Sequence, residues 1–149
     1  MNELIPASDL PGYRDWFEVV RTYAACERVL GERCAAAGLT LAQHDVLAVL
    51  LHEGPQRQNR LAERLFVTKS NVAALLARME RDGLIERDPD PDDARAKRVA
   101  PTNEGRSRAE AAMAAQVEVA RGMIGQLTEA ERAAMGEMMR RVRAFLESQ

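Results

Sequence analysis

The chain has 149 residues, a formal net charge of −2 and an apolar fraction of 46%, which together fit one packed globular unit. Abundant alanine and few aromatic residues favour helices over sheets. A membrane span needs about 18 apolar residues in a row, and the sequence has no such run. The N-terminus also lacks a basic segment followed by an apolar one. We therefore expect a cytoplasmic protein without a membrane partner.

Basic residues concentrate in the middle of the sequence. The segment from Arg57 to Arg108 has 12 Lys and Arg against 9 Asp and Glu, whereas the remainder has 9 against 14. This asymmetry is modest, so it favours a polyanionic partner without being diagnostic of one.

The first predicted helix covers residues 13–37, where apolar residues recur at helical spacing until Gly38, a residue type that suits a helix end. Cys26 and Cys34 lie within it, about 12 Å apart along the helix axis, which is too far for a mutual disulfide. We interpret both cysteines as small core residues, and a thiol-based redox sensor is the alternative.

Two shorter helices follow this segment. Thr40 can cap a helix over residues 41–52, which Gly54 and Pro55 end. The next predicted helix covers residues 58–65 and buries its leucines.

The helix predicted within VTKSNVAALLARMERDG, residues 67–83, has an unusual outer face. Thr68 is placed to cap it and Gly83 to end it. Its inner face carries Val72, Leu75, Leu76 and Met79 at helical spacing. Its outer face carries mainly small residues, namely Ser70, Ala73, Ala74 and Ala77. A solvated helix usually presents long charged residues there, so this face is predicted to approach a partner closely.

Two extended runs, residues 84–87 and 97–100, then flank the segment DPDPDDARA. Because its prolines and aspartates are expected to continue neither helix nor sheet, we predict a β-hairpin with a long tip. Asp88, Asp90 and Asp92 are interpreted as part of a solvated, mobile loop.

The chain is predicted to end in two helices. One begins near Asn103 and ends near Leu127, and the other follows a capping box formed by Thr128 and Glu131. The apolar stripes of the terminal helices exceed what a lobe of about 80 residues can bury, which predicts a homodimer. We therefore expect a single unit over 1–149, with dimerisation helices at 13–37 and 103–147 and a DNA-binding lobe at 40–101.

A short helix, a tight turn, a second helix and a hairpin together predict a mostly α fold, namely a winged helix-turn-helix with a two-stranded β-hairpin wing. Slim outer residues let a helix enter the major groove, and polar groups at its leading end reach base edges. A basic hairpin beside it can enter the minor groove. The DNA-binding candidates are Thr68, Lys69, Ser70, Asn71, Ala74, Arg78, Arg95 and Lys97. The alternative is a protein–protein interaction module that docks its alanine face against another helix.

Residues 61–106 resemble the signature region of the multiple-antibiotic-resistance regulator (MarR) family, whose hallmarks are Asp-x-Arg in the wing and Thr-x-x-Gly at the next helix. Here these are Asp93-Ala94-Arg95 and Thr102-Asn103-Glu104-Gly105, and LTLAQHDVLAVLLHEG also resembles the family's second helix. The likeness implies a homodimer of two DNA-binding lobes that binds a pseudo-palindromic operator, usually as a repressor, and responds to a small ligand or an oxidant.

Carried over by position, the resemblance implies three roles. Thr68 to Asn71 would open the recognition helix, Arg95 would enter the minor groove from the wing tip, and Asp93 would brace the wing by pairing with a basic residue. Two positions depart from the family pattern. Ala94 stands where a further basic residue is common, and Pro101 replaces an apolar strand residue, which predicts a shorter or looser wing.

A ligand pocket, if present, is expected near Trp16, Tyr23 and His44, with a small aromatic or phenolic effector. For His44 itself a partly buried, hydrogen-bonded role is favoured over ligand contact. His44 and His52 are the only histidines and lack partners at metal-ligand spacing, so no metal or cofactor is predicted. The sequence has neither a phosphate-binding glycine loop nor a Gly-x-Ser-x-Gly motif, which argues against an enzyme.

Overall fold

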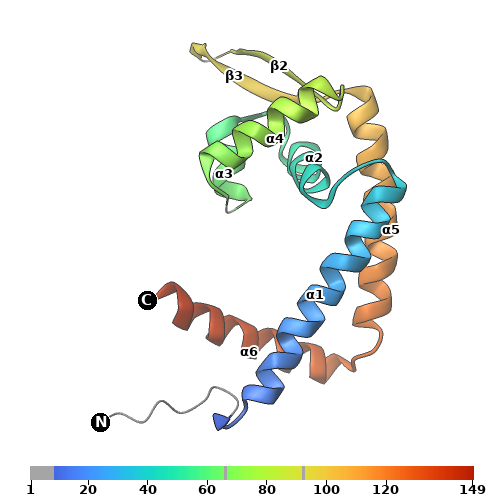
Figure 1. The fold of residues 1–149 in the computed structure, drawn as a ribbon, viewed down its shortest axis with the longest axis vertical. Helices are drawn as coiled ribbons and strands as arrows, with labels where there is room; N and C mark the ends of the chain where they lie inside the picture. Colours follow the sequence, from blue (N-terminus) through green and yellow to red (C-terminus); the bar gives the residue numbers. More distant parts are fainter. Residues whose placement is uncertain (1–8, 66, 92) are drawn as a thin grey trace. The chain divides into compact units, whose positions relative to one another are not determined.

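The computed structural model describes residues 9–65, 67–91 and 93–149, and Figure 1 shows its helices and strands in chain order. These elements are α1 (Tyr13–Ala36), α2 (Leu41–Glu53), β1 (Gln56–Arg57), α3 (Gln58–Arg64), α4 (Lys69–Arg81), β2 (Ile85–Asp90), β3 (Asp93–Pro101), α5 (Asn103–Ile124) and α6 (Glu129–Glu147). The mostly helical fold and the hairpin wing of the prediction are confirmed. The strand β1 was not predicted from the sequence.

Local hydrogen bonds begin the helices where the sequence places their caps. The Thr40 hydroxyl accepts from the backbone N–H of Gln43 at 3.2 Å, and the Gln43 side chain accepts from the backbone N–H of Thr40 at 2.8 Å. The same reciprocal pair joins Thr128 and Glu131 at the start of α6. Each capping box satisfies two backbone donors that a helix N-terminus would otherwise leave unpaired.

The chain forms two compact units, residues 1–113 and residues 114–149. The first contains all elements from α1 to β3 together with the first turns of α5. The second contains the remainder of α5 and all of α6.

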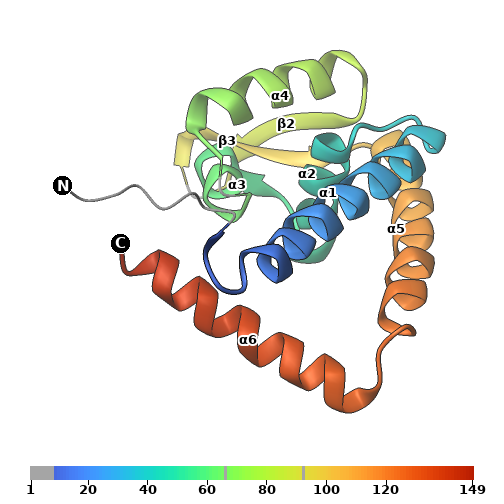
Figure 2. The ribbon, with the colours of Figure 1, turned by 60° about the horizontal axis from the view of Figure 1, so that its bottom comes forward.

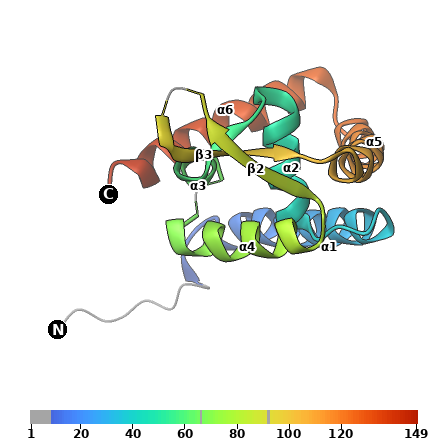
Figure 3. The same ribbon diagram turned by 90° about the horizontal axis from the view of Figure 1, so that it is seen from above.

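The core of the first unit lies between the helices α2, α3 and α4 and the antiparallel sheet, whose strand order is β1-β3-β2. In Figure 2, α4 lies along the strand pair β2 and β3, and in Figure 3 β3 crosses over α3 and α2. The fully buried side chains that join these elements include Val46, Leu47, Leu50, Leu61, Val72, Leu76, Met79, Leu84 and Val99. This shared core fixes α4 relative to the hairpin.

The hairpin is longer, and its tip shorter, than the sequence analysis predicts. Strand pairing continues through the segment expected to be a loop, with Pro89 opposite Lys97 and Asp90 opposite Asp93. Pro89 lies on β2, an edge strand of the sheet, where a residue without a backbone N–H is tolerated. A bulge between Pro89 and Asp90 shifts the register just before the turn.

Pro101 does not shorten the wing, because strand pairing continues through it, while the looser wing of the prediction stays a prediction. Pro101 is the last residue of β3 and pairs with Ile85, while β1 pairs only with Arg98 and Val99. A missing donor at residue 101 therefore costs no bond to β1.

Both units expose large apolar side chains. Trp16, Val20 and Tyr23 on α1 are 42%, 45% and 64% exposed, although Cys34 near the end of the same helix is buried. In the second unit, α6 buries none of its residues and exposes Met135, Met138, Phe145 and Leu146. Among the described residues no single helix is long and apolar enough to cross a membrane. The helices α1 and α2 meet the length and composition criteria only as a pair, and a 77° bend separates them.

Candidate nucleic-acid interface

The N-terminal end of α4 presents polar groups to solvent. Thr68 caps the helix, and its hydroxyl accepts from the backbone N–H of Asn71 at 3.3 Å, as predicted. The same hydroxyl lies 3.1 Å from the Ser70 hydroxyl. Lys69, Ser70 and Asn71 are all exposed in the first turn, where the helix dipole favours an anion.

The remainder of the outer face of α4 is slim. Ala74 and Ala77 are exposed and Ala73 is half-buried, while Arg78 and Arg81 are exposed toward the C-terminal end. On the opposite side Val72, Leu76 and Met79 are fully buried. The helix therefore has a rigid inner face anchored in the core and an outer face that permits close approach of a groove.

The wing adds basic side chains beside this helix. Lys97 is exposed on β3, opposite Pro89, and Arg98 is partly exposed next to it. The backbone of Arg95 belongs to β3, but its side chain lies outside what the structure describes. Asp92 lies outside the described residues altogether. Asp93 is exposed at the start of β3. Its bracing role stays a prediction.

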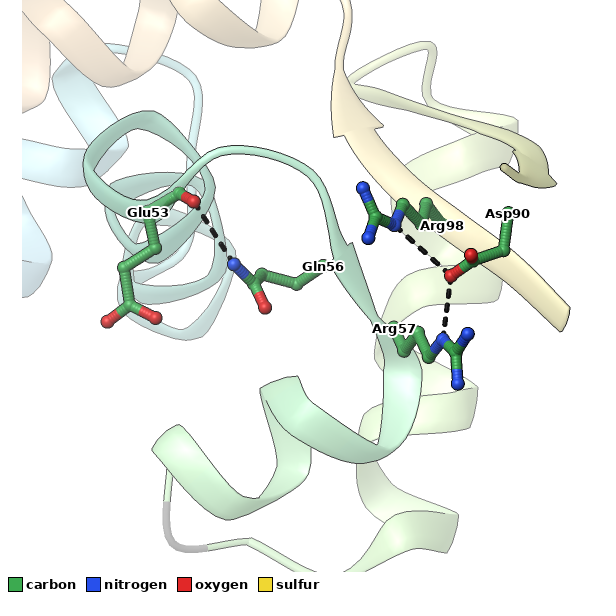
Figure 4. A network of polar contacts seen from close by, with 5 residues as sticks. All are labelled: Glu53, Gln56, Arg57, Asp90 and Arg98. Carbon is green, nitrogen blue, oxygen red and sulfur yellow. Dashed lines mark hydrogen bonds and ion pairs between the residues drawn. The ribbon is translucent and has the colours of Figure 1, made fainter. Parts of the chain in front are cut away.

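Asp90 braces the wing, which corrects its assignment to a solvated loop. Its side chain is fully buried and accepts from Arg57 Nε at 2.6 Å and from Arg98 Nε at 3.1 Å, as Figure 4 shows. Arg57 belongs to β1 and Arg98 to β3, and these two residues face each other across the sheet. One carboxylate therefore ties the wing tip to the strand that leads into α3.

A separate set of contacts joins the base of the hairpin to α5. The Thr102 hydroxyl donates to the Gly83 carbonyl at 2.6 Å and accepts from the Gly105 backbone N–H at 3.0 Å. Gly105 is buried directly against the backbone of Leu84. These contacts give the Thr-x-x-Gly motif a structural role, because threonine caps α5 while glycine allows the helix to touch the sheet.

The three residues predicted to line a ligand pocket lie in different environments. Trp16 and Tyr23 share the exposed side of α1, whereas His44 on α2 is only 2% exposed. His44 is more buried than predicted. Its Nδ1 lies 3.3 Å from the Asp45 carboxylate, and its Nε2 has no hydrogen-bond partner among the described residues.

Neighbouring carboxylates act on the phenol of Tyr23. Its hydroxyl donates to Glu27 at 2.8 Å, and this bond, followed by the charges of Glu27 and Asp45, raises the pKa of Tyr23. Asp45 is also the residue whose carboxylate lies 3.3 Å from His44 Nδ1.

The cysteines differ in accessibility. Cys34 is buried, and this burial, followed by the charge of Asp45, raises the pKa of its thiol. Cys26 is half-buried, and the two form no disulfide. A raised pKa keeps a thiol protonated and weakens its reaction with oxidants. Among residues 9–65, 67–91 and 93–149, no three His, Cys, Asp or Glu side chains gather as a metal site would need.

Comparisons with known proteins agree with this geometry. A family model described as MarR family matches residues 37–96. The transcriptional regulator HosA of Escherichia coli O111:H- is 32% identical over 70% of this chain and 77% of its own length. A MarR mutant from E. coli, solved with operator DNA, has a TM-score of 0.76 at 23% identity and covers 91% of this chain and 96% of its own. The organohalide-sensing RdhR regulator, bound to 2,4-dichlorophenol, has a TM-score of 0.79 at 20% identity, with coverages of 97% and 87%.

Proposed function

Because the chain belongs to the MarR family of transcriptional regulators, we propose that it binds a pseudo-palindromic DNA operator as a homodimer and represses transcription from it. The observation that carries this proposal is the pairing of an exposed polar helix start, Lys69 to Asn71, with a hairpin wing on the same lobe that presents Lys97 to solvent. The helix would read base edges in the major groove, and the wing would enter the adjacent minor groove.

The operator proposal is tested by selecting DNA fragments from a random pool with the purified protein and sequencing them. Two-fold symmetry of the protein predicts two inverted half-sites, with centres separated by one helical turn of about 10 base pairs or a multiple of it. A selected pool without inverted repeats, or with no enrichment at all, would contradict the proposal. Placing the operator before a reporter gene then distinguishes a repressor from an activator.

Exposed apolar side chains support the homodimer. Trp16, Val20 and Tyr23 on α1, and Met135, Met138 and Leu146 on α6, are large hydrophobic groups that lie in solvent in the single chain. Large apolar side chains left in solvent mark an interface, and a second copy of the chain is the simplest partner. Light scattering should give a dimer mass at micromolar concentration. A stable monomer there would refute this part of the proposal.

We further propose that a small aromatic or phenolic molecule regulates DNA binding. The RdhR structure, solved with 2,4-dichlorophenol, supports this ligand class for a protein of the same fold. A site near Tyr23 and His44 would place the ligand against α1 and α2, so that its binding could bias the position of the lobe. Titration with phenols should change the fluorescence of Trp16 and weaken DNA binding together. If neither responds, this ligand class is excluded.

Two alternatives lead to different measurements. Binding to a protein partner through an alanine face should depend weakly on salt, whereas DNA binding through several phosphates should weaken steeply with it. A thiol switch at Cys34 is disfavoured because its thiol is buried and its pKa is raised.

A further inference from the structure

An arginine-lined pocket of about 300 Å³ lies beside the wing, apart from the outer face of α4. Its lining residues are Pro55, Gln56, Arg57, Arg60 and Arg98, which come from the loop before β1, from β1, from α3 and from β3. Three of these five carry guanidinium groups, and among the residues that the structure describes no lining side chain is a carboxylate. Planar guanidinium groups are the side chains that best match the oxygens of a phosphate group.

The pocket is organised from behind by Asp90. Arg57 and Arg98 each donate through Nε to the same buried carboxylate oxygen (Figure 4). An arginine held at Nε has a fixed guanidinium plane, so less conformational entropy is lost when it binds an anion. Asp90 thereby orients two of the three guanidinium groups that line the pocket.

Arg60 completes the pocket from α3. Its nearest recorded partner is Glu63, at 3.6 Å, and both side chains are more than 60% exposed. Such an exposed pair contributes little and can give way to a stronger anion. Asp88 is the acidic residue opposite Arg98 in the strand register, but it is exposed to solvent and does not line the pocket.

The location of the pocket points to the source of the anion. Asp90 pairs with Asp93 at the last rung of the hairpin, so Arg57 and Arg98 meet it next to the wing tip. A wing inside the minor groove has a row of phosphates on either side. We propose that this pocket binds a phosphate group and that the DNA backbone flanking the wing supplies it. The inference rests on the proposed DNA binding and adds Arg60 to the residues that carry it.

The decisive variant is Arg60→Gln, with Arg64→Gln as its matched control. Arg60 is an exposed residue on the surface of α3, so its replacement leaves the core intact. Arg64 lies one turn later on the same helix and pairs with Glu53 outside the pocket, and its replacement removes the same charge. Thermal melts of both variants should match the wild type.

Affinity is measured on the operator and on unrelated DNA at several salt concentrations. Loss of one phosphate contact should reduce the slope of log K against log salt by about 0.9, so the affinity lost between 50 and 200 mM salt shrinks by about 3.5-fold. Arg60→Gln should show this change equally on both DNAs, because a phosphate contact carries no sequence information. Arg64→Gln should keep the wild-type slope. An unchanged slope in Arg60→Gln overturns the assignment to the DNA backbone.

A titration with inorganic phosphate separates the two sources of the anion. The arginine Nε–H signals are followed by NMR without DNA, at constant ionic strength set with chloride. Saturable shifts that disappear in Arg60→Gln, together with an unchanged DNA salt slope, would assign the pocket to a free phosphate compound. If neither the NMR shifts nor a change in the DNA salt slope is observed, the phosphate pocket itself is refuted. If the wild-type protein binds no DNA at all, the proposed function fails, and this titration still tests the pocket.

Discussion

Gly105 is the position at which the junction between the wing and α5 is most sensitive to a single added carbon. A Cβ atom at Gly105 would overlap the carbonyl oxygen of Leu84 and lie 2.9 Å from its carbonyl carbon and 3.2 Å from Leu47 Cδ2. The first two are backbone atoms and cannot rotate away. Gly105→Ala therefore forces α5 to move off the sheet, and we expect it to be destabilising.

The magnitude follows from two opposing effects. Overpacking of a tight core site costs about 1–3 kcal/mol, and contact with backbone places this site at the upper end. Alanine recovers about 1 kcal/mol through its better helix propensity. The net loss is about 2 kcal/mol, or about 4–8 °C in Tm for a chain of this size. The matched control is Gly122→Ala in the same helix, where a Cβ meets nothing within 4 Å. It should stabilise the protein by up to about 1 kcal/mol.

The free energy of unfolding of both variants is measured by chemical denaturation followed by circular dichroism. Equal dependence of this free energy on denaturant concentration shows that the variants unfold in the same transition as the wild type. The reasoning predicts opposite signs for two identical substitutions in one helix. If Gly105→Ala is as stable as the wild type or as Gly122→Ala, the close approach of α5 to Leu84 does not exist in solution.

Further measurements test the interface, the thiols and the caps. Asn71→Ala should cost about 1–3 kcal/mol of discrimination at one base pair of each half-site, measured on matched and mismatched operators. Arg95→Ala should instead weaken binding to all sequences and lower the salt slope by about 0.9, and equal losses for both variants on every sequence would refute base readout by α4. Because burial raises the pKa of Cys34, iodoacetamide should alkylate Cys26 faster than Cys34 in the native protein at neutral pH. The two cysteines should react at equal rates only after unfolding. Hydrogen bonds from the backbone N–H and hydroxyl of Thr128 lower the pKa of Glu131 below its ordinary value. The stabilisation from Glu131 is therefore complete above its unfolded-state pKa and is lost as pH falls through the folded-state pKa. Glu131→Gln should remove this part of the acid dependence of Tm.

The helix starts were predictable because their causes are local. Thr40, Thr68 and Thr128 each accept a hydrogen bond from the backbone three residues later, so the residues that form each cap are visible together in the sequence. The same holds for the apolar spacing of α4, whose inner residues are buried as predicted. The strand β1 was missed because two residues carry no periodic pattern, and only their pairing with Arg98 and Val99 makes them a strand.

The wing shows why a segment's composition can mislead when its partners are distant. Its prolines and aspartates are typical of a loop, yet Pro89 lies on an edge strand and Asp90 is turned inward onto two arginines. Arg57 is 33 residues away in sequence and Arg98 is eight, so no local spacing identifies the set. The inward turn also changes the electrostatics of the tip. A carboxylate that would repel phosphate at the surface is instead buried and orients two more exposed arginines, so a segment rich in aspartate can fold into a wing suited to an anionic partner.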